Sequence, residues 1–143
     1  MASQNYTNLP RALALGQINF STDTFKVLLH TSVPTEANLD AWDNRASVTN
    51  EVTAGNGYTA GGFACTASVS AKDTVNNRVS VTFSTVNPVA QNSTISAAAA
   101  SIYKSTGTAA NDTLVAMVDF GGVVASSNGD FSISFTNPLY INA

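Results

Sequence analysis

The sequence has few of the residues that build catalytic centres, metal sites or covalent cross-links. Its 143 residues include one Cys, one His and one Trp. A lone Cys65 cannot close an intrachain disulfide, and one His with one Cys cannot supply the ligands of a zinc site. No run of acidic residues matches the calcium loop of an EF-hand. We therefore expect neither a metal nor a disulfide.

Charge is equally scarce, at 10% of the residues, with six Lys and Arg against nine Asp and Glu. The basic residues do not cluster, so the chain lacks the positive surface that neutralises phosphates, and we expect no nucleic-acid partner. Ser, Thr and Asn fill about a third of the chain, which predicts a neutral polar surface suited to contacts with proteins.

Signals for membranes and secretion are also missing. No apolar stretch approaches the roughly 20 residues that span a bilayer. Residues 1–8 have neither the basic start nor the apolar core of a secretory signal. We expect a protein with no membrane partner that is made and used in a cytoplasm.

Period-two alternation of apolar and polar residues is the pattern that recurs, and it predicts β-strands. The strand segments are 25–30, 64–71, 78–84, 97–104, 113–120 and 131–135, of which the last is the clearest. Turn-forming residues at 72–77 and 105–112 favour two hairpins. Short helices are predicted at 9–15 and 35–42. The chain is thus expected to be all-β: one antiparallel β-sandwich or jelly-roll-like domain with one or two short helices.

The sequence offers little for catalysis. Only one Ser–His–acid arrangement is possible, around His30, and no G-x-S-x-G nucleophile turn is present. The strand pattern puts His30 on the face of Lys26 and Leu28, which favours a solvent-facing or interface histidine. The glycine-rich residues 55–62 match a relaxed dinucleotide fingerprint, but no helix pattern follows them. We expect no enzyme activity, no cofactor and no small-molecule substrate.

Four apolar or aromatic residues are candidate partner contacts. Residues 1–10 are expected to form an N-terminal arm outside a domain of residues 11–143, with Tyr6 and Leu9 anchoring it on a neighbouring subunit. The alternative is that the arm folds back as an extra strand on its own sheet. Trp42 and Tyr58 are predicted to anchor their own segments or a subunit contact, and a platform for sugar stacking is the alternative.

Two strand segments suggest self-association. Residues 114–120 carry apolar side chains on both faces, and residues 97–100 are four alanines, which allow another layer to approach closely. A second subunit could cover these surfaces, most simply in a homotrimer. Alternatively, both faces are covered within one sandwich.

Four blocks of sequence resemble, in order, a family of small virion proteins of tailed bacteriophages and prophages. The blocks are residues 20–32, 57–62, 102–108, and 118–122 with 127–131. The resemblance implies a structural protein, most plausibly a decoration or cement protein on the capsid exterior. Its implied partners are the major capsid protein and further copies of itself, and the N-terminal arm with Tyr6 and Leu9 is expected to lie against either a neighbouring subunit or the capsid. Its implied location is the virion surface, after assembly in the host cytoplasm.

Three alternative functions stay open at this point. A tail or baseplate component, including a receptor-binding tip, would occur in few copies per particle. A carbohydrate-binding module would need Trp42 or Tyr58 to be exposed. An enzyme would need chemistry that the sequence does not display.

Overall fold

The structure, a computed structural model, describes residues 2–143 and is predominantly β, with 44% strand and 13% helix. The predicted all-β, antiparallel class with two short helices is confirmed. The strands are β1 (Ala2–Asn5), β2 (Phe25–His30), β3 (Phe63–Val69), β4 (Arg78–Thr85), β5 (Ala90–Ser93), β6 (Ser96–Lys104), β7 (Leu114–Ala125), β8 (Gly129–Phe131) and β9 (Leu139–Asn142). The helices are α1 (Leu9–Ala14) and α2 (Glu36–Ala41), with single 3-10 turns η1 (Arg45–Ser47) and η2 (Ala109–Asn111).

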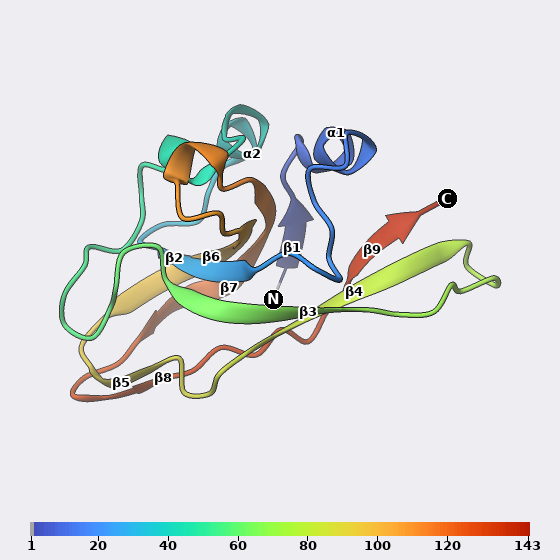
Figure 1. Cartoon of the computed structure of the whole chain (residues 1–143). Helices are drawn as coiled ribbons and strands as arrows, with labels where there is room; N and C mark the ends of the chain where they lie inside the picture. Colours follow the sequence, from blue (N-terminus) through green and yellow to red (C-terminus); the bar gives the residue numbers. More distant parts are fainter. Residues whose placement is uncertain (1) are drawn as a thin grey trace.

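Seven strands form one antiparallel sheet in the order β1-β7-β6-β2-β3-β4-β9. The sheet curls until it is nearly closed, while β5 and β8 pair separately as a two-stranded ribbon (Figure 1). Both predicted hairpins are present, because β3 pairs with β4 and β6 pairs with β7. The helix at α2 begins as its sequence predicts, with Thr35 and Asn38 capping each other's backbone amides.

The segment with the clearest strand pattern departs from the prediction. Only Phe131 of residues 131–135 belongs to a strand, at the end of β8. The alternation persists beyond it, since Ile133 is buried while Ser132 and Ser134 are exposed. Period-two burial requires an extended backbone against an apolar surface, and it does not require a neighbouring strand. The pattern therefore predicted the backbone conformation correctly and the strand pairing incorrectly.

Strands β2, β6 and β7 carry a hydrophobic core on each face. The inner core fills the curl of the sheet and includes Phe25, Ile102 and Val115. The outer core lies between these strands and α2. Its buried members are Tyr6, Leu28, Leu39, Trp42, Ala99, Tyr103, Leu114 and Met117. Burial on both faces explains why β6 and β7 lack clean alternation.

The two cores correct the prediction about self-association surfaces. Residues 97–100 are at most 6% exposed, and residues 114–118 are at most 7% exposed. Both stretches are covered by the chain itself. This corresponds to the alternative in the sequence analysis, in which one domain covers both faces of these strands. Asp119 and Phe120, the last two residues of the predicted segment 114–120, are half-buried. Residues 97–100 and 114–118 therefore offer no surface for a homotrimer.

The predicted N-terminal arm is also corrected. Residues 2–5 form β1, which pairs with residues 116–119 of β7 at the edge of the sheet. Tyr6 is 0% exposed and Leu9 is 2% exposed, so both anchors lie in the chain's own cores. The described part of residues 1–10 thus belongs to the domain, and Met1 lies outside the described residues.

One part of the sheet extends beyond the body. The outer ends of β3 and β4 run out together with β9 beside them, and the connecting turn forms the far tip (Figure 1). We call this extension, residues 67–81 with 139–142, the arm; it is a different segment from the N-terminal arm that was predicted for residues 1–10. The body ends where α1 and residues 16–20 stop covering the inner face of the sheet.

Gly62 is required at the start of β3, because a side chain there would collide with the neighbouring strand. A Cβ on Gly62 would lie 1.7 Å from the Val27 carbonyl oxygen, and its φ is +74°. We expect Gly62→Ala to lower the free energy of unfolding by about 2–5 kcal/mol, the sum of overpacking and left-handed strain. Urea unfolding measures this.

Gly107→Ala is the matched control. Gly107 has φ +87° but no atom within 4 Å of a built Cβ. This variant keeps only the backbone strain, about 1–2 kcal/mol. Equal losses in the two variants would contradict the packing of residue 62 against β2.

Candidate functional site

The sole histidine lies in a chain of hydrogen bonds within the outer core. Asn50 donates through Nδ2 to the Ser32 carbonyl (2.8 Å), which turns its Oδ1 toward His30. His30 Nδ1 therefore donates to Asn50 Oδ1 (2.7 Å), and Nε2 accepts from the Ser101 hydroxyl (2.6 Å). The Tyr6 hydroxyl donates to Ser101 Oγ (2.7 Å). This is the one Ser–His arrangement that the sequence allows.

Burial closes this cluster to substrates. His30, Ser101 and Tyr6 are each 0% exposed, and the Trp42 ring stacks on the imidazole with centroids 6.1 Å apart. A serine nucleophile needs space about 3 Å from its oxygen for the reacting atom, and here the hydroxyl already donates to His30 and accepts from Tyr6 in a fully buried position. The cluster instead joins β2, β6, the residue after β1 and the loop at Asn50.

The predicted solvent-facing position of His30 is therefore wrong. The strand pattern placed His30 opposite the inner core correctly, but α2 and Trp42 cover that second face. Burial lowers the pKa of His30 to about 4, because the imidazolium would lose its hydration. The side chain is neutral at physiological pH.

A second polar cluster fixes the glycine-rich loop. Glu51 Oε1 accepts from the Tyr58 hydroxyl (2.8 Å) and from the Gly61 amide. The Tyr58 hydroxyl accepts from the Leu29 amide (3.1 Å), and the Tyr103 hydroxyl donates to the Gly61 carbonyl. Tyr58 thus holds residues 51–61 against β2, a role that sequence reasoning assigned only in general terms, as an anchor of its own segment.

All four predicted partner contacts are buried within the chain. Tyr6 is 0%, Leu9 2%, Trp42 7% and Tyr58 3% exposed. They are corrected from partner contacts to core residues, because α1, α2 and the loops pack their apolar bodies inward. Trp42 and Tyr58 also offer no platform for a stacked sugar.

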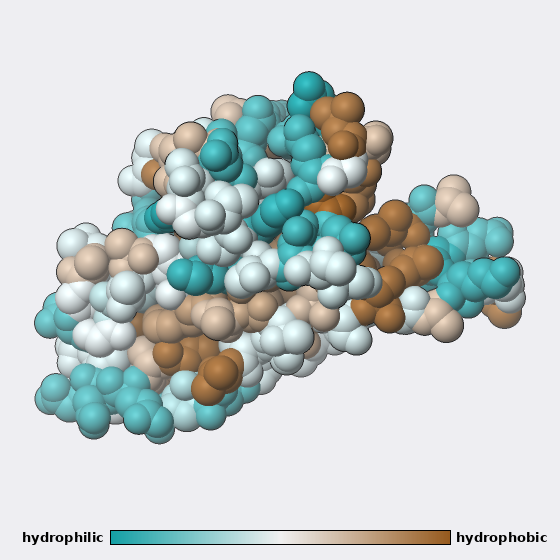
Figure 2. All heavy atoms as spheres, viewed as in Figure 1, coloured by the Kyte–Doolittle hydropathy of each residue, from teal (hydrophilic) through white to brown (hydrophobic). Residues whose placement is uncertain are grey.

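The arm is the first surface that the chain leaves uncovered. Its strands alternate, so that Val69, Val79 and Ile141 share the face that continues the inner core. Val69 is 42% exposed, and the other two are half-buried. Figure 2 shows apolar surface where the arm meets the body beneath α1. The opposite face is polar, and Arg78 lies 3.8 Å over the Tyr140 ring there.

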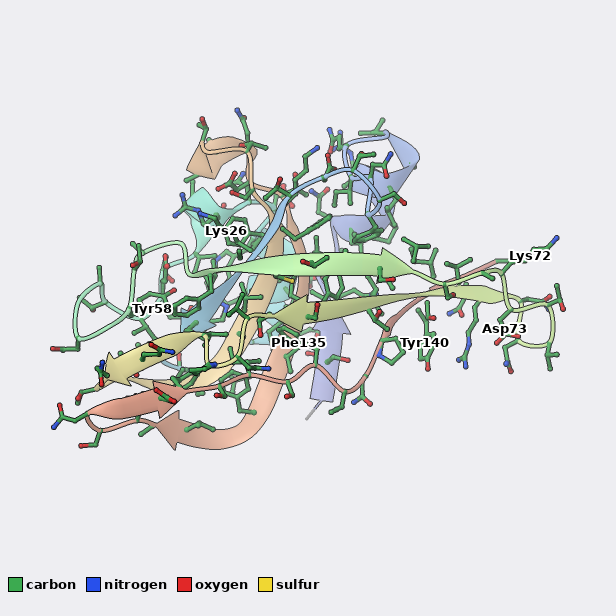
Figure 3. All side chains as sticks on the ribbon, turned by 60° about the horizontal axis from the view of Figure 1, so that its bottom comes forward. Lys26, Tyr58, Lys72, Asp73, Phe135 and Tyr140 are labelled. Carbon is green, nitrogen blue, oxygen red and sulfur yellow. The ribbon has the colours of Figure 1, made fainter. Side chains whose placement is uncertain are left out.

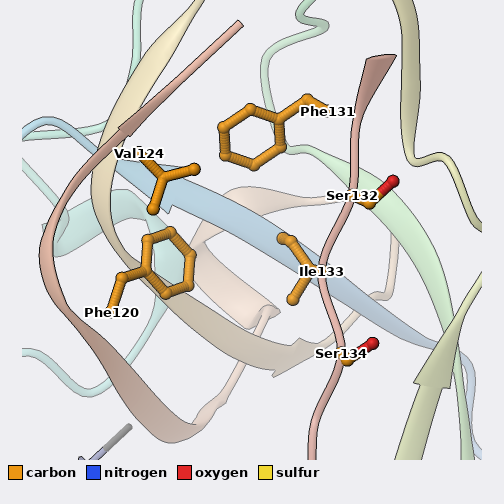
Figure 4. A pocket seen from close by; sticks show the side chains of 6 residues that line it. All are labelled: Phe120, Val124, Phe131, Ser132, Ile133 and Ser134. Atoms are coloured by element: carbon orange, nitrogen blue, oxygen red, sulfur yellow. The ribbon is translucent and has the colours of Figure 1, made fainter.

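A slot between β7 and the segment after β8 is the second uncovered surface. Phe120 and Val124 line it from one side, and Phe131 and Ile133 line it from the other (Figure 4). Its volume is about 190 Å³. Beyond Asp119, β7 has no partner strand on this side, since β1 pairs only with residues 116–119. Ser132 and Ser134 complete the lining, so the slot is mostly apolar.

The remaining reactive groups do not assemble a site. Burial raises the pKa of the Cys65 thiol to about 12, so the thiolate nucleophile does not form at neutral pH. Within residues 2–143, no group of three or more His, Cys, Asp or Glu side chains is placed to hold a metal ion. No helix among these residues is long and apolar enough to cross a membrane.

Comparisons with protein-family models, with curated proteins and with solved structures find no match to this chain. The function must therefore be argued from the surfaces themselves.

The buried histidine predicts how stability depends on pH. The folded pKa of about 4 lies below the ordinary value of 6.5, so the unfolded chain takes up a proton first as the pH falls. We expect the His30 contribution to be full above pH 6.5 and to decline by about 3 kcal/mol as the pH falls to 4. Chemical unfolding across this pH range measures the decline.

His30→Gln separates this contribution from that of the carboxylates. The variant is less stable at pH 7 but lacks the histidine part of the decline between pH 6.5 and 4. Parallel pH profiles for the two proteins would show that His30 is not buried as described.

Proposed function

We propose that this chain is a non-enzymatic structural protein of a tailed-bacteriophage virion, a decoration protein that binds and stabilises the capsid exterior. Its partners are then the major capsid protein and further copies of itself. The observation that carries the binding role is the arm, a sheet extension whose apolar face is left partly exposed at Val69, Val79 and Ile141. The virion setting rests on the four sequence blocks that resemble phage structural proteins.

The arm supports a protein partner because of its chemistry. Val69, Val79 and Ile141 contribute aliphatic surface without a charge among them, and full burial of such a side chain yields about 1.5–3 kcal/mol. The surface is held in place by backbone pairing across three strands, β3, β4 and β9. A rigid apolar strip of this kind loses little conformational entropy on binding.

The burial of the potentially catalytic side chains and the low surface charge also support the proposal of a non-enzymatic binding protein. The side chains with catalytic potential, His30 and Ser101, are buried and mutually satisfied. Three ion pairs are present in the described structure, and the surface is otherwise dominated by neutral polar residues. A neutral surface can be placed beside many identical neighbours without accumulating repulsion.

The two parts of the fourth block meet at the slot. Residues 118–122 supply Phe120, and residues 127–131 supply Phe131. The block at 20–32 covers β2, and the block at 57–62 is the loop fixed by Glu51. The resembling blocks therefore cover residues of the slot, strand β2 and the glycine-rich loop.

The tail or baseplate alternative differs in copy number rather than in chemistry. A decoration protein is present in numbers comparable with those of the major capsid protein, whereas a tail component is present in few copies. The carbohydrate-module alternative loses its basis, because Trp42 and Tyr58 are buried.

Quantitative mass spectrometry of purified particles of the encoding phage tests the proposal. We expect a copy number of the same order as that of the major capsid protein. A copy number near that of tail proteins would move the protein to the tail, and absence from the particle would refute a virion role.

Arm variants test the surface that carries the proposal. We expect Val69→Asp to weaken binding to capsids that lack the protein by about tenfold or more, because it charges a side chain buried on binding. Ser68→Asp is the matched control, since the neighbouring Ser68 is also exposed but lies on the polar face. Equal binding by both variants would contradict a role for the apolar face.

A further inference from the structure

Strand β9 lies at the edge of the seven-stranded sheet, and its outer edge carries unpaired backbone groups. It pairs with β4 on one side only. The Ala143 amide donates to the Asn77 carbonyl (2.8 Å), so these two residues form a hydrogen-bonded pair of the ladder. Such pairs recur at every second residue of an antiparallel ladder. Ile141 therefore directs its backbone groups toward β4, whereas Tyr140 and Asn142 direct theirs outward.

The hydrogen bonds on the other side of β4 agree with this alternation. The Ser80 carbonyl accepts from the Ser70 amide (2.9 Å), and the Arg78 and Asp73 backbones exchange two hydrogen bonds (2.8 and 3.1 Å). The even-numbered residues of β4 thus bond toward β3, and the odd-numbered ones bond toward β9. No described strand pairs with β9 on its outer side. The amides and carbonyls of residues 140 and 142 are therefore open to another strand.

The outer edge of β9 lacks the usual protection of an edge strand. Proteins shield such edges with charged side chains, bulges or a covering element. Residues 137–143 carry no charged side chain, and β9 pairs with β4 in an unbroken register. Tyr140 is 41% exposed, and Asn142 is also exposed. Figure 3 shows Tyr140 on the arm, between the body and the tip that Lys72 and Asp73 mark.

The backbone of this edge is complementary to itself. A two-fold axis at Ile141 places Tyr140 of one copy opposite Asn142 of the second copy, and the reverse. All outward amides and carbonyls of these residues then bond to one another, since both members of each pair point outward. An axis at Tyr140 would instead set Asn142 opposite Pro138, which has no amide to donate. The backbone therefore selects the axis at Ile141.

The side chains favour the same axis. Ile141 lies on the apolar face of the arm, opposite Val79 of β4. The axis brings the Ile141 residues of the two copies together as a non-hydrogen-bonded pair, the type in which side chains lie closest. The half-buried Ile141 side chains then cover each other. On the polar face Tyr140 meets the uncharged side chain of Asn142, so no like charges are opposed. A second copy supplies this match by symmetry, which is the reason to assign it as the partner.

We propose that β9 of one copy pairs antiparallel with β9 of a second copy across a two-fold axis at Ile141, which joins the two sheets. The contact is isologous, so it makes a dimer. This inference deepens the proposed function, on which it rests, by naming the edge through which copies of the chain meet. One short strand from each copy gives a weak contact in solution. Copies held close together on a particle surface would pair more completely, because their effective concentration is higher.

Sedimentation equilibrium of the purified full chain tests the contact and its axis. We expect a monomer–dimer equilibrium. Ile141→Lys and Ile141→Glu should each raise the dissociation constant by about tenfold or more, because like charges then lie directly opposite each other. An equal mixture of the two variants should recover a one-to-one dimer, since opposite charges then meet. Val69→Asp is the matched control: it charges the same apolar face two strands from the edge, and it should still form the dimer.

A second pair of variants tests the backbone hydrogen bonds. Asn142→Pro removes an outward amide from each copy but no hydrogen bond to β4, so the domain should keep its fold, which thermal unfolding checks. We expect its dissociation constant to rise by about tenfold or more, whereas Asn142→Ala keeps the amide and should change it by less than about threefold. Hydrogen exchange measured by NMR should slow at Tyr140 and Asn142 as the protein concentration increases, while the Ile141 amide is protected throughout.

Three results would each overturn the inference. The first is a wild type that stays monomeric up to about 1 mM. The second is an Ile141→Lys and Ile141→Glu mixture that does not recover the dimer. The third is an equal effect of Asn142→Pro and Asn142→Ala on a dimer that does form.

Failure of the inference is distinguishable from failure of the proposed function. A protein that forms the β9 dimer but is absent from particles refutes the virion role alone. A protein that is present on particles but monomeric in solution, with the Tyr140 and Asn142 amides unprotected at every concentration, refutes the contact alone.

Discussion

Burial of β2, β6 and β7 on both faces is the constraint on which the rest of this structure depends. A sheet of this size has more apolar surface than one core can cover, and the chain covers the second face with α2, Trp42 and the residue that follows β1. That arrangement brings Tyr6 against Ser101 and makes the N-terminal strand part of the domain. The same constraint requires small side chains such as Ala99 where the layers approach each other.

Burial on both faces of the sheet also determines how the polar side chains of the outer face are used. A polar side chain on the second face must find partners inside the protein, since an unpaired buried polar group costs about 1–3 kcal/mol. His30, Ser101 and Asn50 satisfy one another, and no buried side-chain polar atom of the described residues lacks a partner. A grouping that would be a nucleophile and its base in an open cleft is a structural link here, because no substrate can reach it.

The cover does not extend over the whole sheet, and function is expected where it ends. The arm continues the inner apolar face beyond α1, and the slot opens where β1 stops pairing with β7. The slot follows from mismatched strand lengths: β7 is 12 residues long and its partner β1 is 4. The binding surface that we propose for this protein therefore lies at the uncovered ends of strands and not in an interior pocket.

The sequence by itself determined strands β2, β3, β4, β6 and β7, the two hairpins and the start of α2, since these depend on alternation, turn residues and capping between near neighbours. It also placed His30 on the face away from the inner core. It did not predict β5 and β9, and it offered β1 only as the alternative to an arm. It did not determine what covers that face, and for this reason Tyr6, Leu9, Trp42 and Tyr58 were misassigned as partner contacts. A buried aromatic and a partner-binding aromatic have the same local pattern, and only long-range packing separates them. The pairing of residues 132–135 was likewise decided by the tertiary structure, because an extended segment gains a ladder only if a second strand edge lies within hydrogen-bonding distance.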